Sequence, residues 1–286
     1  MAKWQGALML APAIVFAGIA LYFVLWNIYI SFTNWSIFSP KPKLVGLSTY
    51  AELFRDMIFK LGLTHSAIIT AIVLAVGTAL SILFAGGLYF LRSNVQRSVY
   101  LSVLLYPMTV SSASTGLIAE FLYMRQIGID WLLARLHLPA VSWLGTALMS
   151  QVSVSLVEIW ALTGLGTLFY LAAFLGVPKD IIEAARIDGA GPFKILFRII
   201  LPNSLSGFII ATSLMFLFSF KIFTVPYFLG GGFTNYYLVT ATMYIYNAWF
   251  GEHFAMASAD AVIITVIVTI VVVAYATYLL KRISGR

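Results

Sequence analysis

Six long apolar runs, separated by polar segments, constrain the fold of this chain more than any other feature. A helix needs about 20 consecutive apolar residues to cross a bilayer, and its backbone groups must be hydrogen-bonded within the segment. The runs cover residues 7–32, 66–91, 99–119, 146–175, 203–226 and 255–280. The sequence therefore predicts an all-α integral membrane protein with six transmembrane helices in a single domain, residues 1–286.

The composition supports a membrane environment. The chain is 62% hydrophobic and only 9% charged, whereas soluble domains are about a quarter charged. The first run, 7–32, exceeds the apolar core of a secretory signal peptide. We therefore expect it to remain as the first span.

The distribution of lysine and arginine predicts the orientation. One side of the predicted membrane carries ten basic residues in shorter loops: Lys3, Arg92, Arg97, Lys179, Arg186, Lys194, Arg198, Lys281, Arg282 and Arg286. The other side carries Lys41, Lys43, Arg55, Lys60, Arg125 and Arg135. The denser side is expected to be cytoplasmic, which places both termini and the loop 176–202 there. This topology also explains the net charge of +7 without a nucleic acid partner.

The cytoplasmic loop 176–202 has a helical pattern of its own. Pro178 suits the first turn of a helix, residues 179–188 are good helix formers, and Gly189 is placed as a stop. Pro192 opens a second pattern that ends at Pro202. Its predicted apolar face consists of Phe193, Leu196, Phe197 and Ile200.

Such short helices are marginal in water and need a packing partner. One interpretation is that the loop lies on the membrane surface and packs against the spans of the same chain. The other is that one helix docks into a groove of a second protein. The physical pattern leaves both interpretations open.

The stretch EAARIDGAGPFKILFRIILP, residues 183–202, resembles the EAA signature of binding-protein-dependent ABC importer permeases. The resemblance implies the transmembrane-domain fold of a type I ABC importer, in which this loop forms coupling helices that insert into a cleft of the ATPase subunit. The residues it assigns to ATPase coupling are Glu183, Ala184, Ala185, Asp188, Gly189, Ile199, Leu201 and Pro202.

A second segment extends the resemblance. Residues 45–54, which follow Ser31-Phe32-Thr33, are similar to the region after the first span in the first permease subunit of the maltose, glycerol-phosphate and trehalose uptake group. This implies import of a sugar or oligosaccharide by alternating access across the cytoplasmic membrane of a prokaryote. The sequence departs from many relatives at Gly230-Gly231-Gly232-Phe233, where they have Gly-Gly-Pro.

The resemblance also implies the partners. They are a second permease, two ABC ATPase subunits and an extracellular solute-binding protein, and a related but different chain is favoured over a second copy as the mate. This chain lacks the G-x-x-x-x-G-K-[ST] loop that cradles nucleotide phosphates. We therefore expect no cofactor on this chain, no enzymatic activity of its own, and ATP with magnesium on the partner ATPases.

Three ionisable residues fall within the predicted spans, where they should face a cavity or a partner. Lys221 and Asp260 lie at similar depth near the outer ends of spans five and six, and we hypothesise that they form a gate pair. The alternative is that each bonds to water or backbone. Glu158 lies near the middle of the fourth span; it is a candidate sugar contact, or a bond to a neighbouring helix.

Sugar sites combine aromatic faces with polar partners. Besides Glu158, the substrate-path candidates are Trp160, Tyr227, Tyr244, Asn247 and Trp249. In a chain that is 15% aromatic, many aromatic residues serve packing or the interface belt instead.

Two other function classes compete. An ion-coupled secondary transporter or channel would show inverted repeats and ion ligands at the membrane midplane, and Glu158 alone fits that description. An intramembrane enzyme or metal site needs converging ligands. The chain has no cysteine, and His65, His137 and His253 are far apart in sequence, so we expect no catalytic residue and no metal site.

Overall fold

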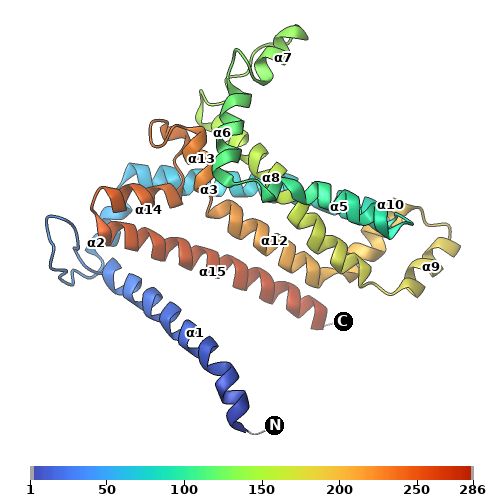
Figure 1. Cartoon of the computed structure of the whole chain (residues 1–286), viewed down its shortest axis with the longest axis horizontal. Helices are drawn as coiled ribbons and strands as arrows, with labels where there is room; N and C mark the ends of the chain where they lie inside the picture. The colour runs from blue at the N-terminus through green and yellow to red at the C-terminus, as the bar shows by residue number, and fades with distance from the viewer. Residues whose placement is uncertain (1–2, 285–286) are drawn as a thin grey trace. The chain divides into compact units, whose positions relative to one another are not determined.

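The computed structural model describes residues 3–284 and shows a chain built from helices, with only isolated β-bridges in the described loops (Figure 1). It divides into two compact units. The first contains residues 1–60 and 241–266, and the second contains residues 61–240 and 267–286.

The first unit combines the N-terminal segment of the chain with a segment near its C-terminal end. Its helices are α1 (Lys3–Ser31), α2 (Ser48–Leu53), the start of α3 (Met57–Ile72), α14 (Ala241–Phe250) and the first half of α15 (Phe254–Ser284). Most of α1 is exposed, as expected for a helix whose solvent is lipid.

The second unit contains the remaining elements. They are the rest of α3, the π-helix η1 (Val73–Gly77), α4 (Thr78–Tyr89), α5 (Asn94–Thr109), α6 (Ser112–Tyr123), α7 (Ile129–Arg135), α8 (Ala147–Leu175), α9 (Lys179–Ile187), α10 (Pro192–Ile195), η2 (Leu196–Ile200), α11 (Leu201–Asn203), α12 (Leu205–Phe220), α13 (Thr224–Leu229), the 3₁₀ turn η3 (Tyr236–Leu238) and the end of α15.

The structure has the predicted apolar segments in the predicted order, and five of the six are single candidate spans. Five helical segments are long and apolar enough to cross a membrane: Ala11–Ser31, Met57–Tyr89, Ala147–Leu175, Gly207–Leu229 and Phe254–Tyr278. The remaining predicted span, 99–119, corresponds to the pair α5 and α6, which are long and apolar enough only together and are bent by 88° at the short break between them.

Pro107 lies inside α5, three residues before the corner in the third predicted span. Proline has no N–H to donate to the preceding turn, so it weakens the helix around it. Helix α5 continues to Thr109, and then Val110 and Ser111 take extended backbone angles before α6 begins. A segment predicted as one span, 99–119, is therefore two helices with a sharp corner.

Helix α8 is the centre of the second unit, and α4, α5 and α12 pack along it. Small residues let these helices approach closely, which is the usual way to pack helices in lipid. A Cβ at Gly164 would collide with the carbonyl oxygen of Leu104 in α5, and one at Gly207 of α12 would collide with Ala173 of α8.

We predict that Gly164→Ala destabilises the protein despite the better helix propensity of alanine. The added methyl meets backbone of α5, and overpacking of this kind costs about 1–3 kcal/mol. The control is Gly87→Ala on α4, where a Cβ meets nothing within 4 Å. In thermal unfolding of the detergent-solubilised protein, Gly164→Ala should lower the midpoint and Gly87→Ala should leave it equal or higher. Equal midpoints for both variants would contradict the close approach of α5 and α8.

Candidate functional site

The first helix of the loop 176–202 forms where the sequence predicts it. Helix α9 spans Lys179–Ile187, with Pro178 at its N-cap and Asp188 at its C-cap. Gly189 has a φ of +76°, a conformation that glycine adopts without the steric cost of a Cβ.

Gly189 ends α9 in a hydrogen-bonded Schellman turn. The N–H of Ala190 donates to the carbonyl oxygen of Ala185 (2.9 Å), and the N–H of Gly189 donates to that of Arg186 (3.0 Å). Two carbonyls that would be unsatisfied at the helix end are thus bonded. This assigns Gly189, a residue of the predicted coupling motif, a structural role that only glycine fills without strain.

The second predicted helix is present but irregular, and its predicted apolar face is partly wrong. Leu196 and Ile200 are buried as predicted, whereas Phe193 and Phe197 are exposed. Ile195, which the pattern omitted, is buried instead. Phe197 lies within the π-turn η2, Leu196–Ile200, whose wider turn departs from the 3.6-residue period. Phe193 and Ile195 precede that turn, and there Ile195 enters the buried cluster in place of Phe193.

The inner face of the loop belongs to the core of the second unit. The loop side chains Ile182, Ala185, Ile195, Leu196 and Ile200 lie in one buried cluster with residues of three spans: Ile82, Ala85 and Leu88 of α4, Tyr170, Leu171 and Phe174 of α8, and Ala211 of α12. Leu196 sits so close to Gly86 that a Cβ there would overlap it. The loop is therefore fixed to the ends of the spans and packs against its own chain.

The outer face of the loop leaves large apolar side chains uncovered. Ile187 is 86% exposed and Phe193 is 72% exposed, and Ile181 and Phe197 are also exposed. Among the predicted coupling residues, Glu183, Ala184, Asp188 and Gly189 are exposed, Ala185 is buried, and Ile199, Leu201 and Pro202 are half-buried. Sequence reasoning missed Ile187 and Phe193 as outward-facing groups. These exposed apolar side chains make this face of the loop a candidate interaction surface.

Two of the charged span residues line one cavity in the second unit. Glu158 of α8 is buried, and Lys221 at the C-cap of α12 is exposed. Both line a cavity of about 330 Å³ together with Ser112, Thr115 and Thr224. This places Lys221 near Glu158 in the structure. Asp260 belongs to the first unit, so the Lys221–Asp260 gate pair stays a prediction.

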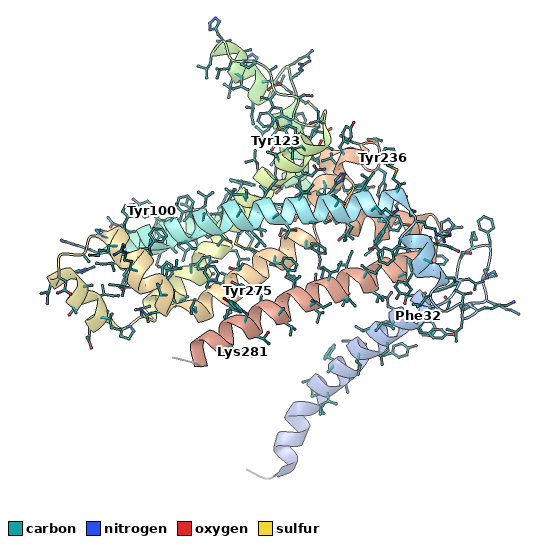
Figure 2. The ribbon with its side chains drawn as sticks, turned by 180° about the vertical axis from the view of Figure 1, so that it is seen from behind. Phe32, Tyr100, Tyr123, Tyr236, Tyr275 and Lys281 are labelled. Atoms are coloured by element: carbon teal, nitrogen blue, oxygen red, sulfur yellow. The ribbon has the colours of Figure 1, made fainter. Side chains whose placement is uncertain are left out.

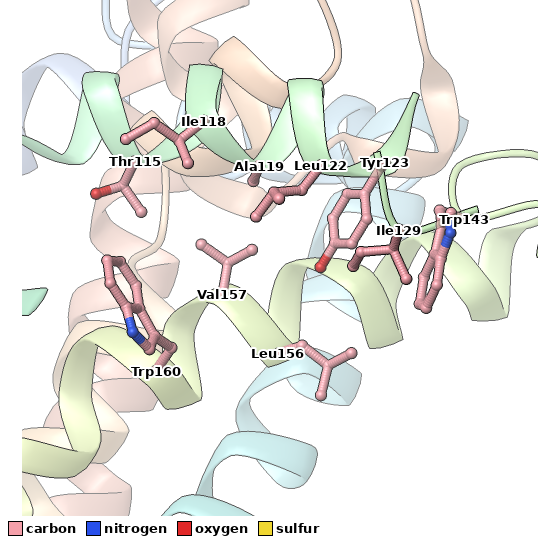
Figure 3. A pocket seen from close by; sticks show the side chains of 10 residues that line it. All are labelled: Thr115, Ile118, Ala119, Leu122, Tyr123, Ile129, Trp143, Leu156, Val157 and Trp160. Atoms are coloured by element: carbon pink, nitrogen blue, oxygen red, sulfur yellow. The ribbon is translucent and has the colours of Figure 1, made fainter. Parts of the chain in front are cut away.

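A second cavity, of about 270 Å³, lies between α6 and α8 and is lined mostly by apolar side chains. Figure 3 shows Thr115, Ile118 and Leu122 of α6 facing Val157 and Trp160 of α8. Thr115 lines both cavities. The predicted site residues Glu158 and Trp160 therefore lie beside neighbouring cavities, one polar and one apolar.

The aromatic wall of the apolar cavity is held by a hydrogen-bond network that sequence reasoning missed. Asp130 accepts hydrogen bonds at Oδ1 from Nε1 of Trp143 (3.0 Å) and from the N–H of Val141 (3.1 Å). The Trp143 ring stacks on Tyr123, with 5.1 Å between ring centroids, and the Tyr123 hydroxyl donates to the carbonyl oxygen of Ser153 (2.8 Å). No local sequence pattern links residues 130 and 143, so only the fold reveals this group.

Figure 2 shows Tyr123 and Tyr236 toward one end of the second unit and Tyr100 of α5 toward the other.

Tyr227 lies in α13, and its ring stacks on Phe223 with centroids 5.2 Å apart. The neighbouring residues Thr224 and Val225 line the polar cavity. Tyr227 is thus close in sequence to the cavity wall, within an aromatic cluster that also includes Phe233.

The other three substrate-path candidates belong to the first unit. The hydroxyl of Tyr244 donates to Oδ2 of Asp56 (2.8 Å); burial, followed by that hydrogen bond and the nearby carboxylates, raises the pKa of Tyr244. The phenol therefore stays protonated as a donor, which gives Tyr244 a structural role. Asn247 is exposed, and the half-exposed Trp249 meets Phe254 edge-on at 4.9 Å.

Asp260 of the first unit carries a buried carboxyl group. It is fully buried, and neither carboxylate oxygen has a hydrogen-bond partner among residues 3–284. A buried carboxylate without partners is costly. The hypothesis of a gate pair requires Asp260 to bind Lys221 in another conformation of the protein, and that pairing stays a prediction.

The chain matches known transport proteins over most of its length. Residues 77–285 match the family described as "Binding-protein-dependent transport system inner membrane component". The chain is 46% identical over 282 residues to the glucose import system permease protein GlcT of Saccharolobus solfataricus. This match covers 99% of each of the two chains. It is 29% identical to the sn-glycerol-3-phosphate transport system permease protein UgpA of Yersinia pestis, covering 93% of this chain and 90% of that protein.

The fold also matches solved structures. A chain of a bacterial ABC transporter that imports the acidic polysaccharide alginate superposes with a TM-score of 0.80. The match covers 98% of this chain and 96% of that chain, at 20% sequence identity. The helical fold is therefore that of an importer permease.

We predict that Gly189→Ala frays the end of α9. A non-glycine residue in the left-handed region costs about 1–2 kcal/mol, which corresponds to roughly a five- to thirtyfold loss of protection where opening is local. The measurement is hydrogen exchange of the α9 amides. The matched control is Gly191→Ala, since Gly191 has a φ of −72° and space for a Cβ. Unchanged exchange in Gly189→Ala would refute the role assigned to the Schellman turn.

Proposed function

Because the chain belongs to the family of binding-protein-dependent transport system inner membrane components, we propose that it is the sugar-translocating permease subunit of an ATP-driven importer. The proposal rests on the family, on the fold, and on the names of relatives that match the chain along most of its length. The glucose permease of Saccharolobus solfataricus favours a monosaccharide such as glucose as the first solute to test.

The observation that carries the mechanism is the two-faced loop 176–202. Its inner side chains Ile182, Ala185 and Leu196 are packed into the core of the spans, and its outer side chains Ile187 and Phe193 are uncovered. A partner that grips the outer face pulls directly on α4 and α8, because the inner face cannot move without disturbing a close-packed core. This is the mechanical requirement for a coupling loop.

ATP hydrolysis is assigned to separate subunits. The chain has no phosphate-cradling loop, so ATP and magnesium bind to two ATPase subunits that contact the outer face of the loop. A second permease, related but different, completes the translocation path, and an extracellular solute-binding protein delivers the sugar. Both termini and the loop 176–202 are on the cytoplasmic side, in accordance with the positive-inside rule.

The two neighbouring cavities form part of the translocation path. The carboxyl group of Glu158 accepts hydrogen bonds from sugar hydroxyls in either protonation state, and Lys221, which lines the same polar cavity, donates to them. Trp160 offers an apolar face to a sugar ring on the adjoining side. Several weak contacts of this kind select a sugar over other solutes and still allow its release.

Alternating access follows from the bend between α5 and α6. Pro107, Ser112 and Thr115 all line the polar cavity, so a change in the 88° corner alters the cavity wall directly. The loop 176–202 anchors the same bundle at its other end. Closure of the ATPases is thereby converted into a change in which side of the cavity is open.

The function is tested by uptake into proteoliposomes that contain the chain with its ATPases, its mate and its solute-binding protein. We predict accumulation of labelled sugar that requires ATP and persists when ionophores collapse all ion gradients. Uptake that follows an ion gradient without ATP would contradict the proposal and favour a secondary transporter.

We further predict that Glu158→Gln weakens sugar transport selectively. Loss of hydrogen bonds to a carboxylate costs about 1.5–3 kcal/mol, so the half-saturating sugar concentration of the permease should rise tenfold or more. The control is Glu120→Gln, because Glu120 of α6 supplies no side chain to either cavity described here. An equal effect of the two substitutions, or a Glu158→Gln variant with an unchanged half-saturating concentration, would remove Glu158 from the path.

A further inference from the structure

A third cavity, of about 360 Å³, lies where the loop 176–202 meets the turn between α4 and α5. Figure 1 shows α9 and α10 at the end of the second unit where α5 begins. The side chains that line it come from α4, the α4–α5 turn, α5, the end of α8, and α9: Tyr89, Arg92, Asn94, Arg97, Leu175, Lys179, Ile182, Glu183 and Arg186.

The charge of this cavity is strongly unbalanced. Four cationic side chains, those of Arg92, Arg97, Lys179 and Arg186, face it together with the single carboxylate of Glu183. Within the part of the chain that the structure describes, none of the four forms an ion pair with a carboxylate. Like charges that converge on one cavity repel one another, so an anion in the cavity stabilises the arrangement.

One of these cations is held rigidly. The guanidinium of Arg97 donates to the carbonyl oxygens of Leu88 (3.0 Å), Tyr89 (3.3 Å) and Leu91 (3.0 Å), and to Oδ1 of Asn94 (3.0 Å). It thereby caps the end of α4 and fixes a positive charge at the wall of the cavity. The positive charges of Arg186 on α9 and of Arg97 on α5 both act electrostatically on the hydroxyl of Tyr89. Charges from two separate segments therefore converge near this hydroxyl.

The surroundings of the cavity are apolar and uncovered. Leu175, which lines it, is 51% exposed. Helix α5, which supplies Asn94 and Arg97, buries no residue and carries an exposed row of Val95, Val99 and Val103 at helical spacing. The occupant that fits both features has an anionic head and an apolar tail.

We propose that this cavity binds the phosphate headgroup of an anionic membrane lipid, with the acyl chains lying along the exposed face of α5. Guanidinium groups bind phosphate oxygens in pairs of charge-assisted hydrogen bonds, and basic pockets at the cytoplasmic ends of spans are suited to such headgroups. The lipid links Arg92 and Arg97 beside α4 to Lys179 and Arg186 on α9. It therefore steadies the coupling loop against the bundle.

An acidic surface of the ATPase would satisfy the same charges but not the rest of the site. It gives no account of the exposed valine row on α5, which needs an apolar neighbour. The lipid accounts for both, and its binding does not depend on which solute the protein transports. The two occupants are separated by experiment.

The test is native mass spectrometry of the purified full chain taken from nanodiscs that contain either phosphatidylglycerol or phosphatidylcholine. The double variant Arg92→Gln/Arg186→Gln should retain about tenfold less phosphatidylglycerol than the unmodified chain, and phosphatidylcholine should not be retained by either. The control, Lys194→Gln/Arg198→Gln, removes two exposed cations of the same loop that do not line the cavity and should retain phosphatidylglycerol fully. Lys179→Gln is a milder second variant, and the thermal midpoint of each variant verifies folding.

Three results would overturn the proposal. Equal losses in the test and control variants would show a diffuse attraction between the basic loop and the membrane. Binding of inorganic phosphate to the delipidated chain as tightly as the lipid would show a site for a free anion. Displacement of phosphatidylglycerol by added ATPase subunits, together with failure of Arg92→Gln/Arg186→Gln to bind them, would assign the cavity to the ATPase.

Discussion

The structure depends on the burial of the inner face of the loop 176–202. Ile182, Ala185 and Leu196 are packed in the same close-packed cluster as residues of α4 and α8, so the loop is part of the bundle. A short helix has little stability alone; here tertiary packing supplies it. Because packed cores do not deform continuously, a force on the loop is carried into the spans.

Helix α8 carries that force to the cavities. It contributes Phe174 to the core that holds the loop and Glu158 to the wall of the polar cavity. Sixteen residues separate these positions, which is about 24 Å along a helix. A rigid helix of this length connects the cytoplasmic grip with the solute path, while the corner between α5 and α6 provides the place where the cavity wall can change.

Much of this was predictable from the sequence, because lipid imposes strong and simple rules. Long apolar runs predicted the order of the spans. Pro178 and Gly189 bounded α9, since proline has a fixed φ that suits a helix start and glycine reaches the left-handed conformation that ends a helix. The π-turn at Leu196–Ile200 was not predictable, since no residue type specifies it, and it contains the misassigned Phe197. Phe193, which precedes the turn, was misassigned because Ile195 enters the buried cluster instead. Pro107 signalled a weak point but not an 88° corner. The convergence of Glu158 and Lys221, and of Asp130 and Trp143, depends on tertiary contacts that no spacing in the chain encodes.

The central claim is that the coupling loop and the bundle move as one body. The chain has no cysteine, so spin labels at Ile187→Cys on α9 and Gly87→Cys on α4, both exposed, report a single distance in the assembled transporter. We predict that pulsed electron–electron double resonance gives the same distance distribution before ATP is added and in a state trapped after hydrolysis. A shift or a broadening of that distribution between the two states would show that the loop moves independently of the spans, and would contradict the account.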